Sequence, residues 1–224
     1  MIDKLKGSIV VICDPGNPLG EKYDDQMLFE VMEILNENQV TVIFDSPYRR
    51  VFFDDSDLFY ARLLKFPNLI ITDSFSKSLG LSGQRIGFVH SLNNAFLKEA
   101  GIRMLYTNNG INAFAQILVY KLLTSENGKN AARKFRETTA AEIAKNIAYL
   151  QQKGFLASRF YQNSLPLGIF SVVNFSEEKL LQHRIGSVSM SYFTNQDPDG
   201  MKAFARVCVS VPHLKFANFF QNLK

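Results

Sequence analysis

Short apolar runs that alternate with a helical pattern constrain the fold of this 224-residue chain more than any other feature. Residues 9–12, 40–44 and 69–72 are continuous apolar runs rich in β-branched side chains, as buried strands are. Residues 23–38, between the first two runs, carry apolar side chains at helical spacing. Buried strands joined by helical crossovers predict a parallel sheet of the α/β class, in which ligands bind at the carboxyl ends of the strands.

A further apolar run at residues 86–89 begins only about a dozen residues after the 69–72 run ends. That interval is too short for a parallel crossover helix, so we predict that the 86–89 strand pairs antiparallel with its neighbour. The sheet is therefore expected to be partial, mostly parallel and flanked by helices.

The second half of the chain has a different pattern. Apolar spacing is helical up to residue 153, and short strand-like runs follow after Gly154. The expected helices are 92–105, 113–123, 129–152 and one after Pro212, and the expected strands are 169–175, 188–191 and 206–211. We predict three parts: residues 1–127 as part of a large domain, residues 128–153 as a connecting helix, and residues 154–224 as a small α+β domain.

Charge and hydropathy exclude several classes of partner. The formal net charge is only +4, because 25 basic residues are offset by 21 acidic ones, and no basic run is interleaved with aromatic residues. We therefore expect no nucleic-acid partner. The apolar run at residues 9–12 is too short for a signal peptide or a membrane span. A cytoplasmic protein without a membrane partner is the resulting expectation.

Neither the cysteines nor the histidines indicate a metal site. Cys13 and Cys208 lie far apart in the sequence and match no metal-binding spacing, so reduced thiols are expected. His90, His183 and His213 share no ligand spacing. We therefore predict no bound metal.

The polar stretch at residues 73–87 carries most of the candidate chemistry. It places Lys77 in a predicted loop of serines and glycines, with Arg85 eight residues further on. A lysine at a strand end can turn inward, lose solvation and attack a carbonyl as a neutral amine. Backbone amides between the glycines, together with Arg85, can close on an anion such as a phosphate. The alternative from these residues alone is a surface turn with a solvated lysine.

Three motifs in this chain resemble those of one family. The Ser-x-Ser-Lys sequence that ends at Lys77 and the Gly-x-Arg-x-Gly sequence around Arg85 resemble the cofactor-lysine signature of class I/II aminotransferases, which are fold-type I pyridoxal-phosphate enzymes. Asn-Pro-Leu-Gly from Asn17 and Asp-Ser-Pro-Tyr from Asp45 resemble two further motifs of that family, in the same order. The resemblance covers the later part of the large cofactor-binding domain and the small C-terminal domain.

The resemblance implies a site for pyridoxal 5′-phosphate. Lys77 would form the Schiff base with the cofactor, and Asp45 would keep its ring nitrogen protonated. Asn17 and Tyr48 would hydrogen-bond the phenolic oxygen of the ring. Taken alone, Asp45 is equally an ordinary strand-to-turn residue, and Asn17 and Tyr48 are ordinary turn residues.

The phosphate and the substrate have their own candidate residues. The resemblance implies that Ser74 and Arg85, helped by Ser76, hold the phosphate. Arg206, at the start of a predicted strand, resembles the family arginine that pairs with the substrate carboxylate, and Asn17 would also contact the substrate. A surface arginine is the alternative for Arg206.

The reaction that the resemblance implies is transfer of an amino group between an amino acid and a 2-oxo acid, in a protein that is a homodimer when complete. The same motifs also serve a lyase, a decarboxylase or a synthase, because they do not determine which bond breaks. A non-catalytic fragment that binds a partner is the alternative of another class. Family segments that precede the Asn17 motif have no counterpart here, so we expect weak or no activity from these 224 residues alone.

Overall fold

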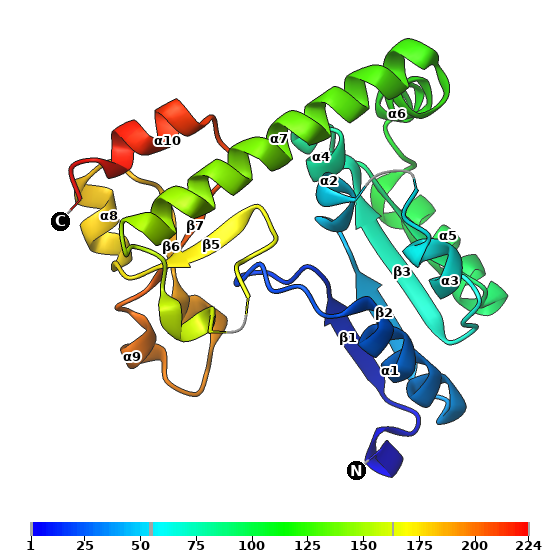
Figure 1. Cartoon of the computed structure of the whole chain (residues 1–224). Coiled ribbons are helices and arrows are strands. Elements are labelled where there is room, and N and C mark those ends of the chain that lie inside the picture. Colours follow the sequence, from blue (N-terminus) through cyan, green and yellow to red (C-terminus); the bar gives the residue numbers. More distant parts are fainter. Residues whose placement is uncertain (1, 54–55, 163, 224) are drawn as a thin grey trace. The chain divides into compact units, whose positions relative to one another are not determined.

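The computed structural model describes residues 2–53, 56–162 and 164–223 (Figure 1). Its backbone contacts divide the chain into two compact units. The first unit comprises Met1–Asp14 and Tyr23–Arg136, and the second comprises Pro15–Lys22 and Glu137–Lys224. The division into residues 1–127, 128–153 and 154–224 remains a prediction.

A four-stranded sheet organises the first unit. Its strands are β1 (Ile9–Cys13), β2 (Thr41–Asp45), β3 (Leu69–Ser74) and β4 (Gly87–Ser91). They lie in the order β1-β2-β3-β4, with the first three parallel and β4 antiparallel to β3. The prediction of a mostly parallel α/β sheet with an antiparallel fourth strand is confirmed.

Helices α1 (Asp25–Glu37) and α3 (Phe59–Leu63) cover one face of this sheet. Asp24 caps α1 by accepting a 2.9 Å hydrogen bond from the backbone N–H of Met27, which fixes the start of the helix. Apolar side chains recur at helical spacing on α1 and at alternate positions on the strands, so they meet in one buried layer. That layer contains Leu28, Phe29, Met32, Leu35, Val40, Val42, Phe44, Phe59, Leu63, Leu69 and Ile71.

Two short helices follow strands of this sheet. α2 (Arg49–Phe52) lies shortly after β2, and α4 (Phe75–Ser78) follows β3 directly. The loop prediction for Lys77 was therefore wrong, because Lys77 lies within α4. The hydroxyl oxygen of Ser74 accepts a 3.2 Å hydrogen bond from the backbone N–H of Ser76, and this cap lets a helix begin where the strand ends.

The longer helices of the first unit lie close to their predicted bounds. They are α5 (Asn94–Asn108), α6 (Ala113–Thr124) and the first part of α7 (Glu126–Gln152). A second buried cluster of this unit contains Leu79, Ile86, Ala115, Val119 and Ala132. Across the described ranges, no helix is both long and apolar enough to span a membrane.

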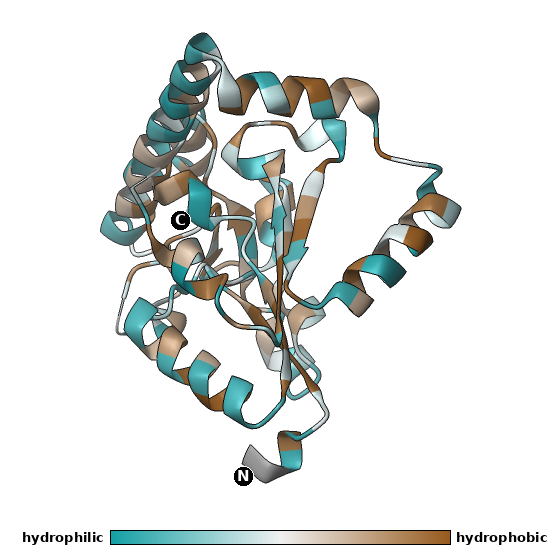
Figure 2. Ribbon diagram, turned by 90° about the vertical axis from the view of Figure 1, so that its right-hand side faces the viewer, coloured by the Kyte–Doolittle hydropathy of each residue, from teal (hydrophilic) through white to brown (hydrophobic). Residues whose placement is uncertain are grey.

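Part of the first unit exposes apolar surface. Within the described parts of the chain, α5 buries none of its side chains. α6 is rich in apolar residues (Figure 2), and it exposes Phe114, Ile117 and Tyr120 at every third position. On β1, Ile9 and Val11 are 63% and 66% exposed. Exposed apolar surface of this extent is typical of a surface that binds another polypeptide.

The second unit contains a three-stranded antiparallel sheet in the order β5-β7-β6. Its strands are β5 (Phe170–Val173), β6 (Ser187–Ser189) and β7 (Ala205–Cys208). Besides the later part of α7, its helices are α8 (Glu177–Gln182), α9 (Pro198–Met201) and α10 (His213–Phe220). The small α+β character predicted for the C-terminal region is confirmed.

All three predicted strands of this unit end early. The 169–175 strand stops at Val173. The 188–191 strand stops at Ser189, whose hydroxyl oxygen accepts a 3.3 Å hydrogen bond from the backbone N–H of Ser191 and so starts a 3₁₀ helix. The 206–211 strand stops at Cys208. Beyond it, the backbone oxygens of Val209 and Val211 accept hydrogen bonds of 2.9 and 2.8 Å from the buried side chain of Asn146. The described residues also form 3₁₀ helices, at Ile2–Leu5, Ser82–Gln84, Ser158–Phe160 and Met190–Phe193.

Candidate active site

Asp45 and Tyr48 lie where β2 ends and α2 begins. The strand register pairs Asp45 with Thr72 of β3, and the Thr72 hydroxyl donates a 2.9 Å hydrogen bond to Oδ1 of Asp45. This bond fixes the direction of a half-buried carboxylate at the carboxyl end of the parallel strands, where α/β proteins bind ligands. Tyr48 is 7% exposed and precedes the first residue of α2.

Lys77 is half-buried in α4, at the carboxyl end of β3. Its ammonium group has no hydrogen bond or ion pair with any residue that the structure describes. The backbone around it is held, because Ser74 caps α4 and the Ser82 hydroxyl donates a 3.0 Å hydrogen bond to the backbone oxygen of Ser76. Lys77 therefore combines a fixed backbone with an amine that is available for chemistry.

Arg85 follows this segment and adopts a left-handed backbone conformation, with a φ of 52°. Its side chain is exposed, and Nη1 donates a 3.1 Å hydrogen bond to the backbone oxygen of Ser82. Gly87 begins β4, and a Cβ at this position would overlap the backbone oxygen of Asp73. Only glycine lets β4 approach β3 here, so Gly87 positions the segment that carries Arg85.

Asn17 and Arg206 belong to the second unit. Nη1 of Arg206 donates a 2.7 Å hydrogen bond to Oδ1 of Asn17. The guanidinium carbon lies 4.0 Å from the centre of the Phe170 ring and 5.0 Å from that of Phe193, contacts that orient the group. The structure thus brings Asn17 and Arg206 together, and it places the other six candidate residues in the first unit.

A buried polar network that no motif indicates adjoins the candidates of the first unit. The hydroxyl oxygen of Tyr60, on α3, lies 2.8 Å from Oγ of Ser46 and 3.3 Å from Oδ2 of Asp73. Ser46 directly follows Asp45, and Asp73 directly precedes Ser74. Burial raises the pKa of the Asp73 carboxyl to about 6, and burial also raises the pKa of the Tyr60 phenol above its usual value. Perturbed groups of this kind gather at functional sites.

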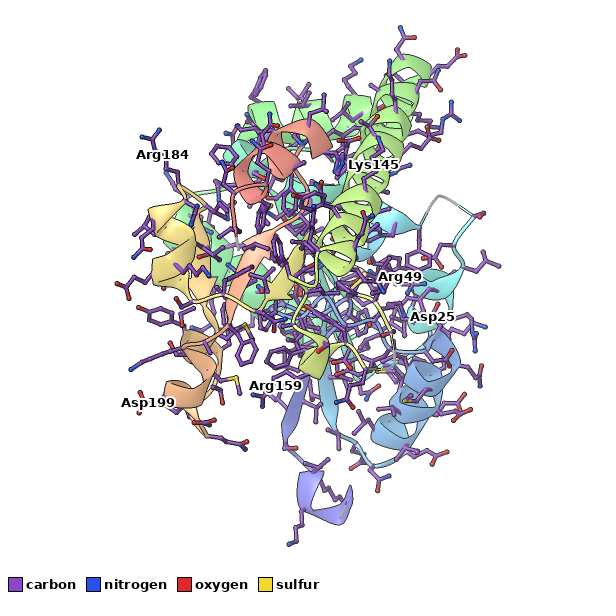
Figure 3. All side chains as sticks on the ribbon, turned by 60° about the vertical axis from the view of Figure 1, so that its left-hand side comes forward. Asp25, Arg49, Lys145, Arg159, Arg184 and Asp199 are labelled. Carbon is purple, nitrogen blue, oxygen red and sulfur yellow. The ribbon has the colours of Figure 1, made fainter. Side chains whose placement is uncertain are left out.

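A second feature missed from the sequence is the buried guanidinium group of Arg49 (Figure 3). Two of its nitrogens pair with Asp25 at 2.9 and 2.8 Å, and two pair with Asp57 at 2.8 and 3.0 Å. The rings of Phe53 and Phe59 lie 4.3 and 3.7 Å from its central carbon. Burial alone lowers the pKa of Arg49, but the two carboxylates raise it more, so Arg49 stays charged. The pairing of Arg49 with Asp25 links α2 to α1.

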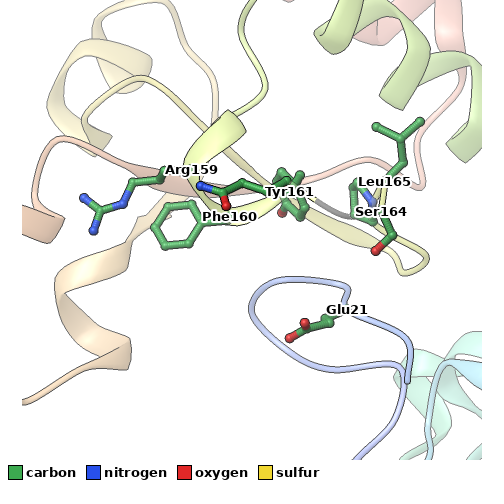
Figure 4. Close-up of a pocket in the computed structure, with 8 residues that line it drawn as sticks. Glu21, Arg159, Phe160, Tyr161, Ser164 and Leu165 are labelled. Carbon is green, nitrogen blue, oxygen red and sulfur yellow. The ribbon is translucent and has the colours of Figure 1, made fainter. Parts of the chain in front are cut away.

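A pocket of about 150 Å³ lies within the second unit (Figure 4). Glu21 and Arg159 contribute charged groups to its lining, and Tyr161 contributes its ring. The Tyr161 hydroxyl donates a 2.8 Å hydrogen bond to the backbone oxygen of Leu19 and accepts one of 2.9 Å from the backbone N–H of Val172. Among the described residues that line this pocket, none is a candidate from the motifs, so the pocket is not the predicted site.

Comparison with known proteins identifies relatives for nearly the whole chain. The model of the family described as "Aminotransferase class I and II" matches residues 2–222. A histidinol-phosphate aminotransferase of Christiangramia forsetii is 36% identical over 83 residues, which is 37% of this chain and 22% of that protein. An aspartate aminotransferase of Pyrococcus horikoshii is 27% identical over 131 residues, which is 58% of this chain and 33% of that protein. The chain thus matches less than two thirds of the length of these relatives.

Solved structures show the same fold. An aromatic aminotransferase from Pyrococcus horikoshii superposes with a TM-score of 0.77 at 20% identity, over 96% of this chain and 58% of that one. A histidinol-phosphate aminotransferase from Clostridium acetobutylicum gives a TM-score of 0.73 at 23% identity, over 100% of this chain and 64% of that one. With a family model that matches residues 2–222 and a fold that agrees, the chain belongs to the class I and II aminotransferase family.

Proposed function

We propose that the first unit binds pyridoxal 5′-phosphate through Lys77. The observation that carries this proposal is the half-buried residue Lys77, which follows a parallel strand and whose amine has no polar partner among the described residues. The same unit supplies hydroxyl and guanidinium donors for a phosphate and a fixed carboxylate for a ring nitrogen. This donor set fits the cofactor.

The phosphate needs donors that can satisfy a dianion. Ser74 and Ser76, at the start of α4, offer hydroxyl groups, and Arg85 offers a guanidinium fork. The hydroxyl oxygen of Ser74 accepts the cap hydrogen bond from the backbone N–H of Ser76, so the Ser74 hydroxyl has a defined position. We assign the phosphate to these three residues.

The ring needs a different set of contacts. Asp45, whose Oδ1 is fixed by Thr72, accepts a hydrogen bond from the protonated ring nitrogen and keeps that nitrogen protonated. Tyr48 donates its hydroxyl hydrogen to the phenolic oxygen. When bound, the cofactor supplies an electron sink for the electrons of the substrate α-carbon.

We infer that the whole protein transfers an amino group between an α-amino acid and a 2-oxo acid. Arg206, oriented by Asn17, recognises the carboxylate that both substrates share. The amine of Lys77 would take the proton from the α-carbon of the amino acid in one half of the reaction, and would give a proton to the α-carbon derived from the 2-oxo acid in the other half. Family members form homodimers, and we propose the same for the complete protein; the exposed apolar surface of the first unit agrees with this.

The test follows the amino group. Protein loaded with pyridoxal phosphate is mixed with an amino acid, and the 2-oxo acid product is measured, with Lys77→Ala as the control. We expect one 2-oxo acid per cofactor. The 224 residues match less than two thirds of the length of their relatives, so we propose that their turnover alone lies well below the order of 1 s⁻¹ of a competent enzyme. Release of carbon dioxide or ammonia in place of a 2-oxo acid would show a decarboxylase or a lyase instead.

A further inference from the structure

A buried chain of polar groups joins the two segments that carry the candidate cofactor residues of the first unit. Tyr60 places its hydroxyl oxygen 2.8 Å from Oγ of Ser46 and 3.3 Å from Oδ2 of Asp73. The Ser46 hydroxyl donates a 3.1 Å hydrogen bond to the backbone oxygen of Asp14. Ser46 and Asp73 are only 0% and 7% exposed, so these groups depend on one another for hydrogen bonds.

An ionised Asp73 receives little compensation for its burial. Oδ2 of Asp73 accepts a long, 3.3 Å hydrogen bond from the Tyr60 hydroxyl, which lies closer, at 2.8 Å, to Oγ of Ser46. The Ser46 hydroxyl donates to the backbone oxygen of Asp14 and so gives Asp73 no hydrogen bond. Asp73 is only 7% exposed, so water replaces these donors poorly. The geometry therefore favours the neutral form of Asp73.

The surroundings of Asp73 also favour its neutral form. Burial raises the pKa of the Asp73 carboxyl to about 6, against the lowering effect of the hydrogen bond from the Ser74 N–H. On the adjacent strand β4, the residue opposite Asp73 is the apolar Phe88. The charged or titratable groups that act on Asp73 from the other elements around it are Asp45 of β2, Arg50 of α2 and Tyr60 of α3.

We propose that Asp73, together with Tyr60, is a positioning residue that couples proton uptake to phosphate binding at Ser74; this rests on the proposed function. Oδ1 of Asp73 accepts a 2.6 Å hydrogen bond from the backbone N–H of Ser74. An ionised Asp73 therefore holds a negative charge beside the residue that binds the phosphate, and proton uptake removes that charge. Because such coupling is reciprocal, a bound phosphate in turn makes Asp73 bind its proton more strongly.

The test compares wild type with Asp73→Asn, which has the same shape but cannot ionise. Dissociation constants are measured for pyridoxal phosphate and for pyridoxal, which lacks the phosphate, between about pH 5 and pH 8. Asp73→Asn should bind pyridoxal phosphate about 10-fold more tightly than wild type near pH 8 and equally near pH 5, within the usual range for coupled sites. Pyridoxal should show no difference. The ligand itself changes charge between pH 5 and pH 8, but this affects both proteins equally. The ratio of their dissociation constants at each pH therefore reports on Asp73 alone.

Tyr60→Phe distinguishes this coupling from a merely structural role. The Tyr60 hydroxyl lowers the pKa of Asp73, so its removal should move the midpoint of the pH dependence upward and leave the affinity near pH 5 unchanged. If both variants instead lose affinity equally at every pH, the two residues only support the fold, and the coupling is disproved.

A second measurement separates the coupling from the proposed function. If neither protein binds pyridoxal phosphate, the cofactor site is wrong, and a carbon-13 NMR titration of the Asp73 carboxyl with and without sulfate decides the coupling. Sulfate keeps its charge over this pH range. A titration midpoint near 6 that sulfate raises supports the coupling, whereas a midpoint near the usual 3.8, or one that sulfate does not move, contradicts it.

Discussion

Nη1 of Arg206 and Oδ1 of Asn17 lie 2.7 Å apart, although 189 positions separate the two residues in the chain. The contact joins the segment Pro15–Lys22 to strand β7 within the second unit. Asn17 fixes one edge of the guanidinium fork, and the rings of Phe170 and Phe193 lie beside it. An arginine with a fixed direction can recognise a carboxylate by paired hydrogen bonds.

Arg206→Ala should raise the KM for the amino acid and leave cofactor binding nearly unchanged, because the arginine contacts the substrate carboxylate. The expected loss in kcat/KM corresponds to about 2–5 kcal/mol, as for one partner of a charged hydrogen-bonded pair. Steady-state kinetics on a preparation that turns over provide the measurement. Arg184→Ala, which removes an exposed arginine of the same unit, is the matched control. Equal kinetics in both variants would show that Arg206 is an ordinary surface residue.

Arg49→Met should destabilise the first unit by about 3–5 kcal/mol, because it leaves the carboxylates of Asp25 and Asp57 without their buried cation. Urea unfolding monitored by circular dichroism measures this loss. Arg103→Ala breaks an exposed ion pair with Glu99 on α5 and should cost only about 0–1 kcal/mol. A similar small effect for both variants would contradict a stabilising role for the Arg49 cluster.

Asp73→Asn should change stability in a pH-dependent way. The folded-state pKa of Asp73, about 6, lies above its usual value of 3.8, so the native state binds this proton more tightly than the unfolded chain. The stabilisation is fully present below pH 3.8 and is lost as the pH rises through 6. The free energy of unfolding of the variant should therefore exceed that of wild type by up to about 3 kcal/mol near pH 8, and the two values should be equal near pH 4. Urea unfolding at both pH values tests this, and a constant difference would refute it.

The exposed row on α6 should cause concentration-dependent association of the chain. Phe114→Lys combined with Ile117→Glu places charges on that row and should shift the population toward monomers in sedimentation velocity experiments. Leu214→Lys, on an isolated exposed leucine of α10, is the control and should change nothing, since single exposed apolar residues are normal. Association that is unaffected by the double variant would locate the interface elsewhere.

The strands and long helices could be predicted because burial imposes a local period on the sequence. Val42 and Phe44 of β2 are buried and alternate with half-buried neighbours, as the pleat of a strand requires. The short helix α4 could not be predicted in this way. It depends on a cap by Ser74 at the point where β3 ends, which is a tertiary feature as much as a local one.

The buried polar network of Tyr60, Ser46 and Asp73 could not be predicted from the sequence for a similar reason. Tyr60 and Asp73 are 13 positions apart and meet only once α3 has packed against β3. One signal did exist, since alternation along β3 puts Asp73 on the same face as the buried Leu69 and Ile71. A carboxylate on a buried face needs a polar partner, but the identity of that partner follows only from the fold.

The most direct test of the central claim is to locate the cofactor on the chain. Protein incubated with pyridoxal phosphate is treated with borohydride, which makes a bond between the cofactor and a lysine permanent, and the digested peptides are analysed by mass spectrometry. Lys98 and Lys121, of the same unit, serve as internal controls. We predict that the peptide containing Lys77 carries the label and that Lys77→Ala abolishes it. A label on Lys98 or Lys121 at the same level, or one that persists in Lys77→Ala, would contradict the assignment of the active site.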